Sequence, residues 1–572
     1  MKNRPYSHGR VLKKSSADLY TADTAKLSEG FFGSFINKFS PGINSKMKAK
    51  MAFASFVENF FLTRLLKRFS ANFLSTKVRS SAAGILCFGF LASAFSLMEL
   101  IMHGGGEFEV MELGLCIGLM LGSALLCLSG RLWCEVLDTS FLGGLFDPSG
   151  RVVEGDFSQS EHHSSGLGVF MGVLLGILSF FVSPALIVVA FVVAVAVALI
   201  FIRPEFGLLL LALFLCFLDG LSLAVLTALV LLAYILKAAR GKRVFKLGVE
   251  DIFAFLLFLL WLVGAVAQQS DPLSLFLGFG IYIIFAKLLG GKEQIRQLSC
   301  AFIFSLIAFC AVALLWGDTV LISSSILDKL FRYAGDINKP LEVSLDIIMM
   351  LLPIAAAAYT KTPFSKVCGF VGLAAGLFTL LFCTSPGALF CFVISLAVLA
   401  ILLKRKLLPL VLALVLSVGI SLVFYPQIFS LLFNSFVPLL KNTLGSVASG
   451  LGYLFNTDFV SLLFGRCGLP EMELDFWADM IFRFGVLGFG VFVLAFVFCV
   501  RKALGALKIS SDKMLSAFVL GVLISLCMLL VRGLTADIAD DQSVFCFFWM
   551  IMGTLCGACK VVALNSDKSD LF

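Results

Sequence analysis

Charged residues are scarce in this chain. Only 14% of its 572 residues are Asp, Glu, Lys or Arg, whereas 60% are hydrophobic, including 61 Phe. A soluble protein of this length does not need so large an apolar fraction to form its core, so the composition excludes an ordinary soluble protein. Apolar segments long enough to cross a bilayer recur along most of the sequence. The sequence therefore predicts an all-α polytopic helical membrane protein.

A basic excess is also lacking over most of the chain, although the formal net charge is +8. Residues 1–80 contain fifteen Lys and Arg against four Asp and Glu, and the rest of the chain is slightly acidic. A basic arm beside membrane spans is typical of the cytoplasmic face, where anionic lipids attract it. We therefore expect membrane lipid as a partner and no nucleic acid.

Paired metal-binding or redox motifs are missing as well. Most of the sixteen Cys lie singly in apolar segments, where a thiol behaves as a small hydrophobe. The C-x-x-C of Cys556 and Cys559 has no second pair. His162 and His163 are adjacent, so their side chains point apart on a helix and favour a solvated loop over a metal site. We expect no metal ion and no cofactor.

The first 80 residues contain no continuous apolar run of the signal-peptide type, so no cleaved signal is expected. We expect residues 1–80 to form a cytoplasmic basic arm that is partly disordered. Residues 47–74 have Phe at helical spacing followed by Arg and Lys. This amphipathic helix either lies in the membrane interface or docks on the cytoplasmic ends of the bundle.

The remaining sequence divides into three regions. Residues 81–202 form N-terminal transmembrane spans with a polar loop over 130–166, residues 203–560 form a transmembrane core, and residues 561–572 form a cytoplasmic tail. We expect about 14–16 transmembrane helices from the length and number of the apolar segments. The expected spans lie near residues 81–102, 110–129, 167–182, 184–202, 206–218, 221–236, 252–267, 273–290, 298–316, 343–359, 366–383, 387–403, 407–424, 476–499, 514–531 and 543–560.

The distribution of Lys and Arg between alternate connections predicts the orientation. From residue 237 onward one set of connections contains seventeen Lys and Arg, whereas the opposite and longer set contains five. The basic set is expected to be cytoplasmic, which places both termini inside. The long connections 317–342 and 425–475 are then on the outer face.

Charged residues gather in and beside these outer connections. Arg332 and Lys339 lie in the first long loop, and Arg466 lies in the second, within FGRCG. The second loop leads into a hydrophobic helix in which Asp475, Asp479 and Arg483 recur every four residues and so share one face. An ionisable group inside an apolar span is a functional-site hypothesis.

These residue types suit a lipid-linked diphosphate sugar. Arg and Lys side chains bind phosphate oxygens, and a carboxylate can deprotonate an acceptor hydroxyl. We therefore take Arg332, Lys339, Arg466 and Arg483 as candidate substrate-binding residues and Asp475 and Asp479 as candidate catalytic residues. The alternative is that these charges neutralise one another at the water interface, with Asp479 and Arg483 as an ordinary helical ion pair.

The order, spacing and sidedness of these segments resemble the O-antigen ligase and polymerase family. The resemblance covers roughly Arg203 to Lys560. The segments that carry it are RPEFGLLLLALFL at 203–215, QQSDPLSLFLGFGIYIIFAKLL at 268–289, FRYAGDINKPLEVSLDIIMMLLPIAAA at 331–357, TSPGALFCFVI at 384–394, LLFGRCG at 462–468, DFWADMIFRFGVLGFGVFVLAF at 475–496 and GLTADIADDQSVFCFFWMIMG at 533–553.

The resemblance implies a helical membrane glycosyltransferase of the GT-C type, without a required metal. It also implies a glycan donor carried on undecaprenyl diphosphate and the plasma membrane of a bacterium. The chain departs from the family where a His-Asn pair usually opens the helix, because Leu474 and Asp475 stand there. It also has Ser385-Pro386-Gly387 in place of Ser-Arg-Gly.

Three functions remain open from the sequence. The chain transfers or polymerises a polyprenyl-diphosphate-linked glycan onto an unknown acceptor, with an Asp in place of the family His. Alternatively it is a transporter or non-catalytic binder of a lipid-linked saccharide, or a structural scaffold organised by the basic arm. Transport predicts a polar route at mid-depth, whereas the spans show few polar residues there apart from Ser, Thr and occasional Gly.

Overall fold

The structure is a computed structural model of the chain. It describes residues 78–103, 107–127, 164–215, 218, 220–239, 248–268, 273–316, 348, 350–355, 363–382, 463, 476–510, 512–533 and 542–569. The chain divides into two compact units, and nearly all described residues belong to the larger one, Arg68–Ala233 with Leu247–Phe572. Of the smaller unit, the structure describes residues 234–239.

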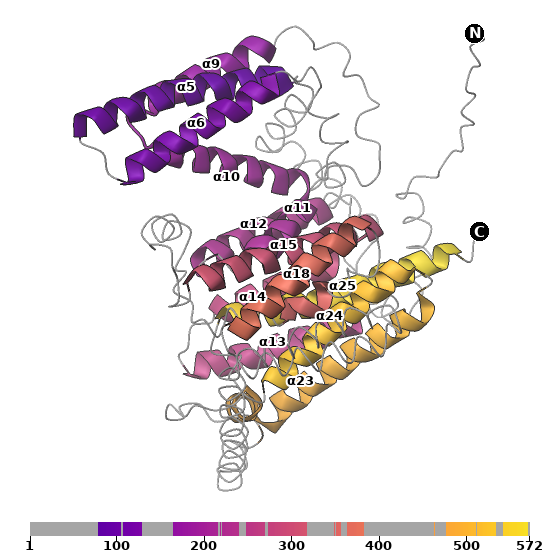
Figure 1. The fold of residues 1–572 in the computed structure, drawn as a ribbon. Helices are drawn as coiled ribbons and strands as arrows, with labels where there is room; N and C mark the ends of the chain where they lie inside the picture. The colour runs from indigo at the N-terminus through magenta and orange to yellow at the C-terminus, as the bar shows by residue number, and fades with distance from the viewer. Residues whose placement is uncertain are drawn as a thin grey trace, which may run out of the picture. The chain divides into compact units, whose positions relative to one another are not determined.

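Every element in the described ranges is an α-helix, so the predicted all-α class is confirmed (Figure 1). The helices are α5 (Val78–His103), α6 (Glu107–Cys127), α9 (Ser164–Leu178), α10 (Pro184–Ile202), α11 (Pro204–Phe214), α12 (Gly220–Ala239), α13 (Val249–Gln268), α14 (Leu273–Leu288), α15 (Lys292–Trp316), α18 (Pro363–Phe382), α23 (Phe476–Ile509), α24 (Lys513–Arg532) and α25 (Gln542–Ser569).

Seven of these helices are long and apolar enough to cross a membrane, and four more are shorter apolar helices. The chain is therefore a multi-pass membrane protein. The expected span at 184–202 coincides with α10, which begins at Pro184, where a missing backbone N–H costs nothing. The expected spans at 343–359, 387–403 and 407–424 lie wholly or largely outside the described residues, as do the arm, the helix over 47–74 and most of the loop over 130–166.

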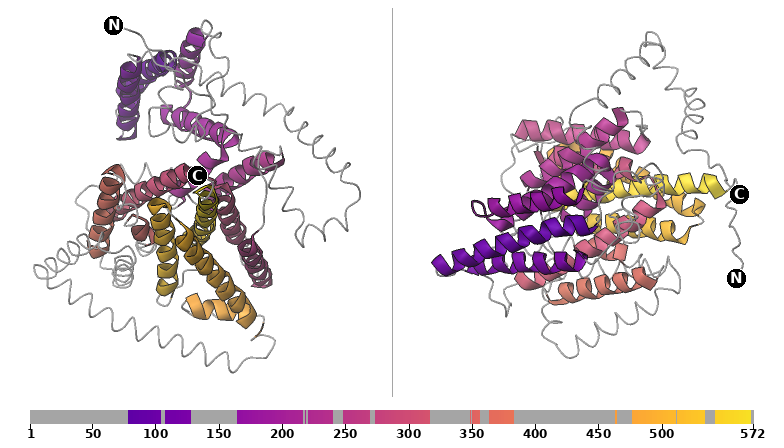
Figure 2. Two further views of the ribbon diagram at one scale, coloured as in Figure 1. Left: turned by 90° about the vertical axis from the view of Figure 1, so that its right-hand side faces the viewer. Right: turned by 90° about the horizontal axis from the view of Figure 1, so that it is seen from above.

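The first described helices pack closely through glycine. α5 lies against α6 and α9 (Figures 1 and 2). A Cβ atom on Gly84 of α5 would clash with the backbone of Gly168, and one on Gly172 of α9 would clash with the backbone of Gly84. Small residues allow such close backbone approach between membrane helices, where van der Waals packing replaces the hydrophobic effect.

The C-terminal helices form a second packed group. α25 lies along α14, α13 lies along α23, and α24 contacts both α23 and α25. α24 and α25 are mostly buried by their neighbours, whereas α23 exposes much of its apolar surface. The exposed apolar side chains are what a bilayer would cover. Gly553 and Gly557 let α25 approach the α14 backbone, since a Cβ on either residue would lie 2.6 Å from a carbonyl oxygen of Tyr282 or Phe285.

One predicted helix is corrected by the structure. We expected a continuous span over 476–499 with Arg483 inside it, but α23 is kinked at Gly485, where φ is 67° and ψ is 179°. This backbone conformation is essentially restricted to glycine. The kink separates a short segment, Phe476–Phe484, from the long apolar helix that follows. Asp479 and Arg483 therefore belong to the short segment and not to the continuous apolar span.

Candidate functional site

The structure describes two of the six predicted site residues, and only their backbone. Arg332, Lys339, Arg466 and Asp475 lie outside the described residues, so their grouping stays a prediction. Asp479 and Arg483 lie on the short segment of α23, where the structure describes the backbone but not these two side chains. Their spacing of four residues within helical backbone keeps them on one face.

The short segment is fixed to the end of α24 by Trp477. The indole Nε1 of Trp477 donates a hydrogen bond of 3.0 Å to the backbone oxygen of Leu530, in the last turn of α24. The last carbonyl groups of a helix have no partner within the helix, so this bond satisfies one of them. The Trp477 ring also meets Phe489 and Phe492 of the long part of α23, with ring centroids 5.9 and 6.0 Å away.

A buried cation lies two residues beyond this contact. Arg532, which is not among the predicted site residues, is the last residue of α24 and is 6% exposed. A cation at a helix C-terminus interacts favourably with the helix dipole, which is a structural reason for its presence. The start of α23 and the end of α24 thus bring Trp477, Arg532 and the segment carrying Asp479 and Arg483 to one end of the bundle. We call it the predicted outer end.

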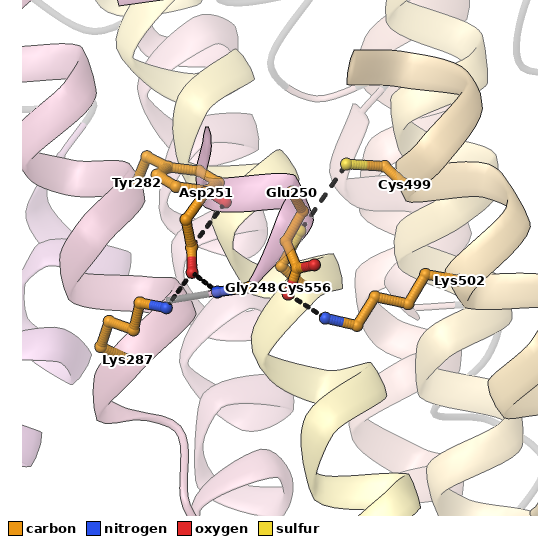
Figure 3. A network of polar contacts seen from close by, with 8 residues as sticks. All are labelled: Gly248, Glu250, Asp251, Tyr282, Lys287, Cys499, Lys502 and Cys556. Carbon is orange, nitrogen blue, oxygen red and sulfur yellow. Dashed lines mark hydrogen bonds and ion pairs between the residues drawn. The ribbon is translucent and has the colours of Figure 1, made fainter. Parts of the chain in front are cut away.

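A second polar group lies where α13 begins, and it is the best-defined polar arrangement in the described residues (Figure 3). Asp251, which is 6% exposed, forms an ion pair with Lys287 of α14. Its other oxygen accepts a hydrogen bond of 3.1 Å from the hydroxyl of Tyr282. The backbone N–H of Gly248 donates to Asp251 over 2.6 Å. Three donors therefore surround one buried carboxylate.

The neighbouring carboxylate holds a third helix. Glu250 forms an ion pair with Lys502 of α23 (Figure 3). The first turn of α13 is thus bound to α14 by Asp251 and to α23 by Glu250. Acidic residues in the first turn interact favourably with the positive end of the helix dipole. Lys287, in the last turn of α14, interacts favourably with the negative end of that helix's dipole. Asp251 also bonds back to the N–H before the helix, in the manner of a capping box.

The same end of the bundle contains other charged contacts. Lys292, at the start of α15, forms an ion pair with Asp512, the N-cap residue of α24. The ion pairs therefore join the first turn of α13 to α14 and α23, and the first turn of α15 to the start of α24. We call this end the basic end. Of the Lys and Arg predicted to be cytoplasmic, Lys287, Lys292 and Lys502 therefore lie at the basic end, while the side of the membrane that it faces stays a prediction.

Buried thiols lie beside the basic end. Cys499 of α23 and Cys556 of α25 are both buried, and their Sγ atoms are 3.6 Å apart. Cys559, the other member of the C-x-x-C, is also buried. In the part of the chain that the structure describes, no three His, Cys, Asp or Glu side chains are arranged to hold a metal ion. The thiols pack between α23 and α25 as small apolar groups.

The contacts at the basic end are not among the contacts that the sequence predicts. Lys287 and Lys502 were counted as cytoplasmic cations, but nothing in the sequence pairs them with Asp251 and Glu250. The sequence does indicate a helix start here, because Gly248 with Glu250 and Asp251 shortly after it is typical of a helix N-terminal cap. Identifying Lys287 and Lys502 as the partners of these carboxylates requires knowing which helices are neighbours. Trp477 is also not among the predicted site residues.

No protein-family model matches the sequence, and no curated protein matches it. The resemblance to the O-antigen ligase and polymerase family therefore stays a prediction.

Proposed function

We propose that the chain transfers or polymerises a glycan carried on a polyprenyl diphosphate at the outer face of a bacterial plasma membrane. In this proposal Arg332, Arg466 and Arg483, with Lys339, bind the diphosphate. Arg guanidinium groups bind phosphate oxygens with two parallel hydrogen bonds, which fixes orientation as well as charge. Asp475 or Asp479 acts as the base that removes a proton from the acceptor hydroxyl.

The observation that carries the proposal is the kink at Gly485. The kink turns the segment bearing Asp479 and Arg483 out of the axis of the long apolar helix. Trp477 and the fully buried Met480 hold this segment against the bundle, beside the last turn of α24. Charged residues on a docked segment at a membrane surface can meet a diphosphate in the headgroup region, which a charge in the middle of a membrane span cannot.

The distribution of buried polar groups favours transfer over transport. In the middle of the core helices several buried hydroxyls bond to backbone oxygens, although the buried hydroxyls of Thr227 and Ser305 have no hydrogen-bond partner in the described residues. Thr379 bonds to Ala375 over 2.9 Å, Thr554 bonds to Met550 over 2.7 Å, and Ser525 bonds to Met350 over 2.6 Å. A transporter is expected to have a polar route at mid-depth, often with broken helices. In α23 the helix break lies near its start, where a surface site would use it.

The proposal is tested by replacing the three guanidinium groups. Arg332→Ala, Arg466→Ala and Arg483→Ala are each introduced into the full chain, and turnover of the lipid-linked glycan is measured in a strain that depends on the chain. Removal of a cation that binds the diphosphate should lower turnover at least about tenfold, since charge-assisted hydrogen bonds contribute about 1.5–3 kcal/mol each. Arg296→Ala, an exposed Arg at the basic end, is the control and should have no effect.

Turnover that is unchanged in all three variants contradicts the proposal. Asp475→Asn and Asp479→Asn then distinguish catalysis from binding. Loss of turnover with retained binding of the lipid-linked donor in either variant supports a base at that position. Retained turnover in both variants contradicts an Asp base.

A further inference from the structure

An exposed stripe runs along the long part of α23 toward the basic end. Its residues are spaced by three and four positions and therefore share one helix face. Leu494, Val497 and Leu504 are about half exposed, at 48%, 50% and 49%. Arg501 and Lys508 are also exposed and alternate with them. The face is purely apolar as far as Val497 and alternates between cationic and apolar from Arg501 onward.

The exposed cations of the hairpin of α23 and α24 have no carboxylate partner in the part of the chain that the structure describes. Most other cations of the basic end have a carboxylate partner: Lys287 pairs with Asp251, Lys502 with Glu250, Lys292 with Asp512, and Arg296 with Glu293. Within the described residues, Arg501, Lys508 and Lys513 form no such ion pair. This leaves three positive charges on the hairpin that joins α23 to α24.

Hydrogen bonds join the described residues on the two sides of this hairpin's turn. The carboxylate of Asp512 accepts a hydrogen bond of 2.7 Å from the backbone N–H of Met514. The Ser516 hydroxyl donates to the backbone oxygen of Asp512 over 2.7 Å, and Ser510 and Ser516 hydroxyls lie 3.0 Å apart. These hydrogen bonds brace the backbone next to Lys508 and Lys513, and such bracing reduces the entropy cost of binding a ligand there.

The depth of the stripe matches a membrane interface. With a rise of about 1.5 Å per residue, Arg501 lies roughly 22 Å and Lys508 roughly 33 Å along the helix from Val486. The hydrocarbon core of a bilayer is about 30 Å thick. If the apolar helix begins at the outer boundary, Arg501 reaches the headgroups by extending its side chain, and Lys508 lies among them. Exposed Leu504 lies between Arg501 and Lys508, and exposed Ile509 directly follows Lys508, which suits a surface that meets both headgroups and acyl chains.

We propose that Arg501, Lys508 and Lys513 form a binding site for the phosphate headgroup of an anionic phospholipid. The exposed Val497 and Leu504 contact its acyl chains. The partner is a phosphatidylglycerol-type lipid of the leaflet at the basic end, because the surplus of positive charge selects an anionic headgroup and the apolar residues select a lipid over a free phosphate. The site is independent of the glycan chemistry proposed for the opposite end.

The test uses the purified full chain in detergent, titrated with fluorescently labelled phosphatidylglycerol and, separately, labelled phosphatidylcholine. The variant is Arg501→Gln with Lys508→Gln. The matched control is Arg296→Gln with Lys292→Gln. It also removes one Arg and one Lys from the basic end, but these two cations are paired with carboxylates. Each surplus cation near an anionic membrane contributes about 1 kcal/mol, or about fivefold in affinity.

The site variant is expected to bind phosphatidylglycerol roughly 25-fold more weakly, at two times 1 kcal/mol, while the control variant changes less than about twofold. Phosphatidylcholine binding should be the same in all proteins. Inorganic phosphate should not displace the lipid. Arg501→Lys keeps the charge and should keep most of the affinity, which separates lost binding from lost folding.

Equal loss in the site and control variants overturns the proposal, because it shows a general effect of charge. Displacement of the lipid by inorganic phosphate also overturns it, since the site would then bind free phosphate. Unchanged phosphatidylglycerol affinity in the Arg501→Gln, Lys508→Gln protein overturns it directly.

Discussion

Asp251 is a buried carboxylate at the basic end with three side-chain contacts to polar groups. Its carboxylate is buried and is compensated by Lys287, the Tyr282 hydroxyl and the Gly248 N–H. The desolvation of a buried carboxylate and ammonium largely cancels their attraction, so the intact pair adds little net stability. Removing one member is different, because the other charge then stays buried without its counter-ion.

At the residue scale we therefore predict that Asp251→Ala is strongly destabilising. The Lys287 ammonium, whose side chain is 8% exposed, would lose its carboxylate partner, and the cost expected for breaking such a pair is roughly 3–5 kcal/mol. Thermal unfolding of the purified protein in detergent measures this as a lower unfolding temperature. Glu293→Ala breaks a more exposed pair with Arg296 and should cost no more than about 0.5 kcal/mol. Equal unfolding temperatures for the two variants would show that Asp251 has no special role.

At the scale of the element, contact between α14 and α25 depends on glycine. A Cβ on Gly557 would lie 2.6 Å from the backbone oxygen of Phe285, and a carbonyl oxygen cannot move aside as a flexible side chain can. We predict that Gly557→Ala separates the two helices locally and destabilises the protein by roughly 1–3 kcal/mol.

Gly490→Ala is the matched control for this prediction. Gly490 lies within the long part of α23, and a Cβ there would meet nothing within 4 Å. Alanine is the better helix former by about 1 kcal/mol, so this variant should be as stable as the parent or slightly more stable. Chemical unfolding in mixed micelles compares the two variants. A Gly557→Ala protein as stable as Gly490→Ala would show that the close approach of α14 and α25 is not real.

The kink in α23 yields a separate prediction. Gly485 has φ of 67° and ψ of 179°, which an Ala residue adopts only with strain of roughly 1–3 kcal/mol. Gly485→Ala should therefore straighten α23 or destabilise it, and in both cases the Trp477 contact with Leu530 is weakened. Quenching of Trp477 fluorescence by an added aqueous quencher should increase relative to the parent, with the other four Trp replaced by Phe in both proteins. Unchanged quenching would contradict the role of the kink.

The elements were largely predictable from the sequence, because runs of apolar residues bounded by Pro, Gly or charge define membrane helices. α10 coincides with the span expected at 184–202, and α11 is the short helix expected near 206–218. The kink at Gly485 was not predictable in the same way, because apolar periodicity continues on both sides of that glycine. The contacts of Asp251 required knowing that α13, α14 and α23 are neighbours, which a single sequence does not reveal.

For the candidate site, the sequence predicts which residues take part but not how their side chains are arranged in space. The structure describes the backbone at Asp479 and Arg483, but Arg332, Lys339, Arg466 and Asp475 lie outside the described residues. It adds Arg532 and Trp477, which are not among the predicted site residues. Their meeting at one end depends on the antiparallel packing of α23 and α24, which no local pattern encodes.

At the scale of the whole molecule, the predicted orientation is open to measurement. The basic end is expected to be cytoplasmic, which places the C-terminus inside as well. A green fluorescent protein fused after Phe572 should therefore be fluorescent, and alkaline phosphatase fused at the same place should be inactive. Fusions after Arg532 should give the opposite result. Active phosphatase after Phe572 would reverse the orientation and place the segment bearing Asp479 and Arg483 on the cytoplasmic side.

The most direct test of the proposed function is to locate the bound donor on the protein. The full chain in vesicles is photolabelled with an undecaprenyl diphosphate bearing a photoreactive group near the diphosphate, and the labelled peptides are identified by mass spectrometry. We predict labelling within Phe476–Phe484 and in the segments containing Arg332 and Arg466, displaced by excess unlabelled undecaprenyl diphosphate. Labelling that is confined to the basic end, or that excess lipid does not displace, would contradict the proposed site.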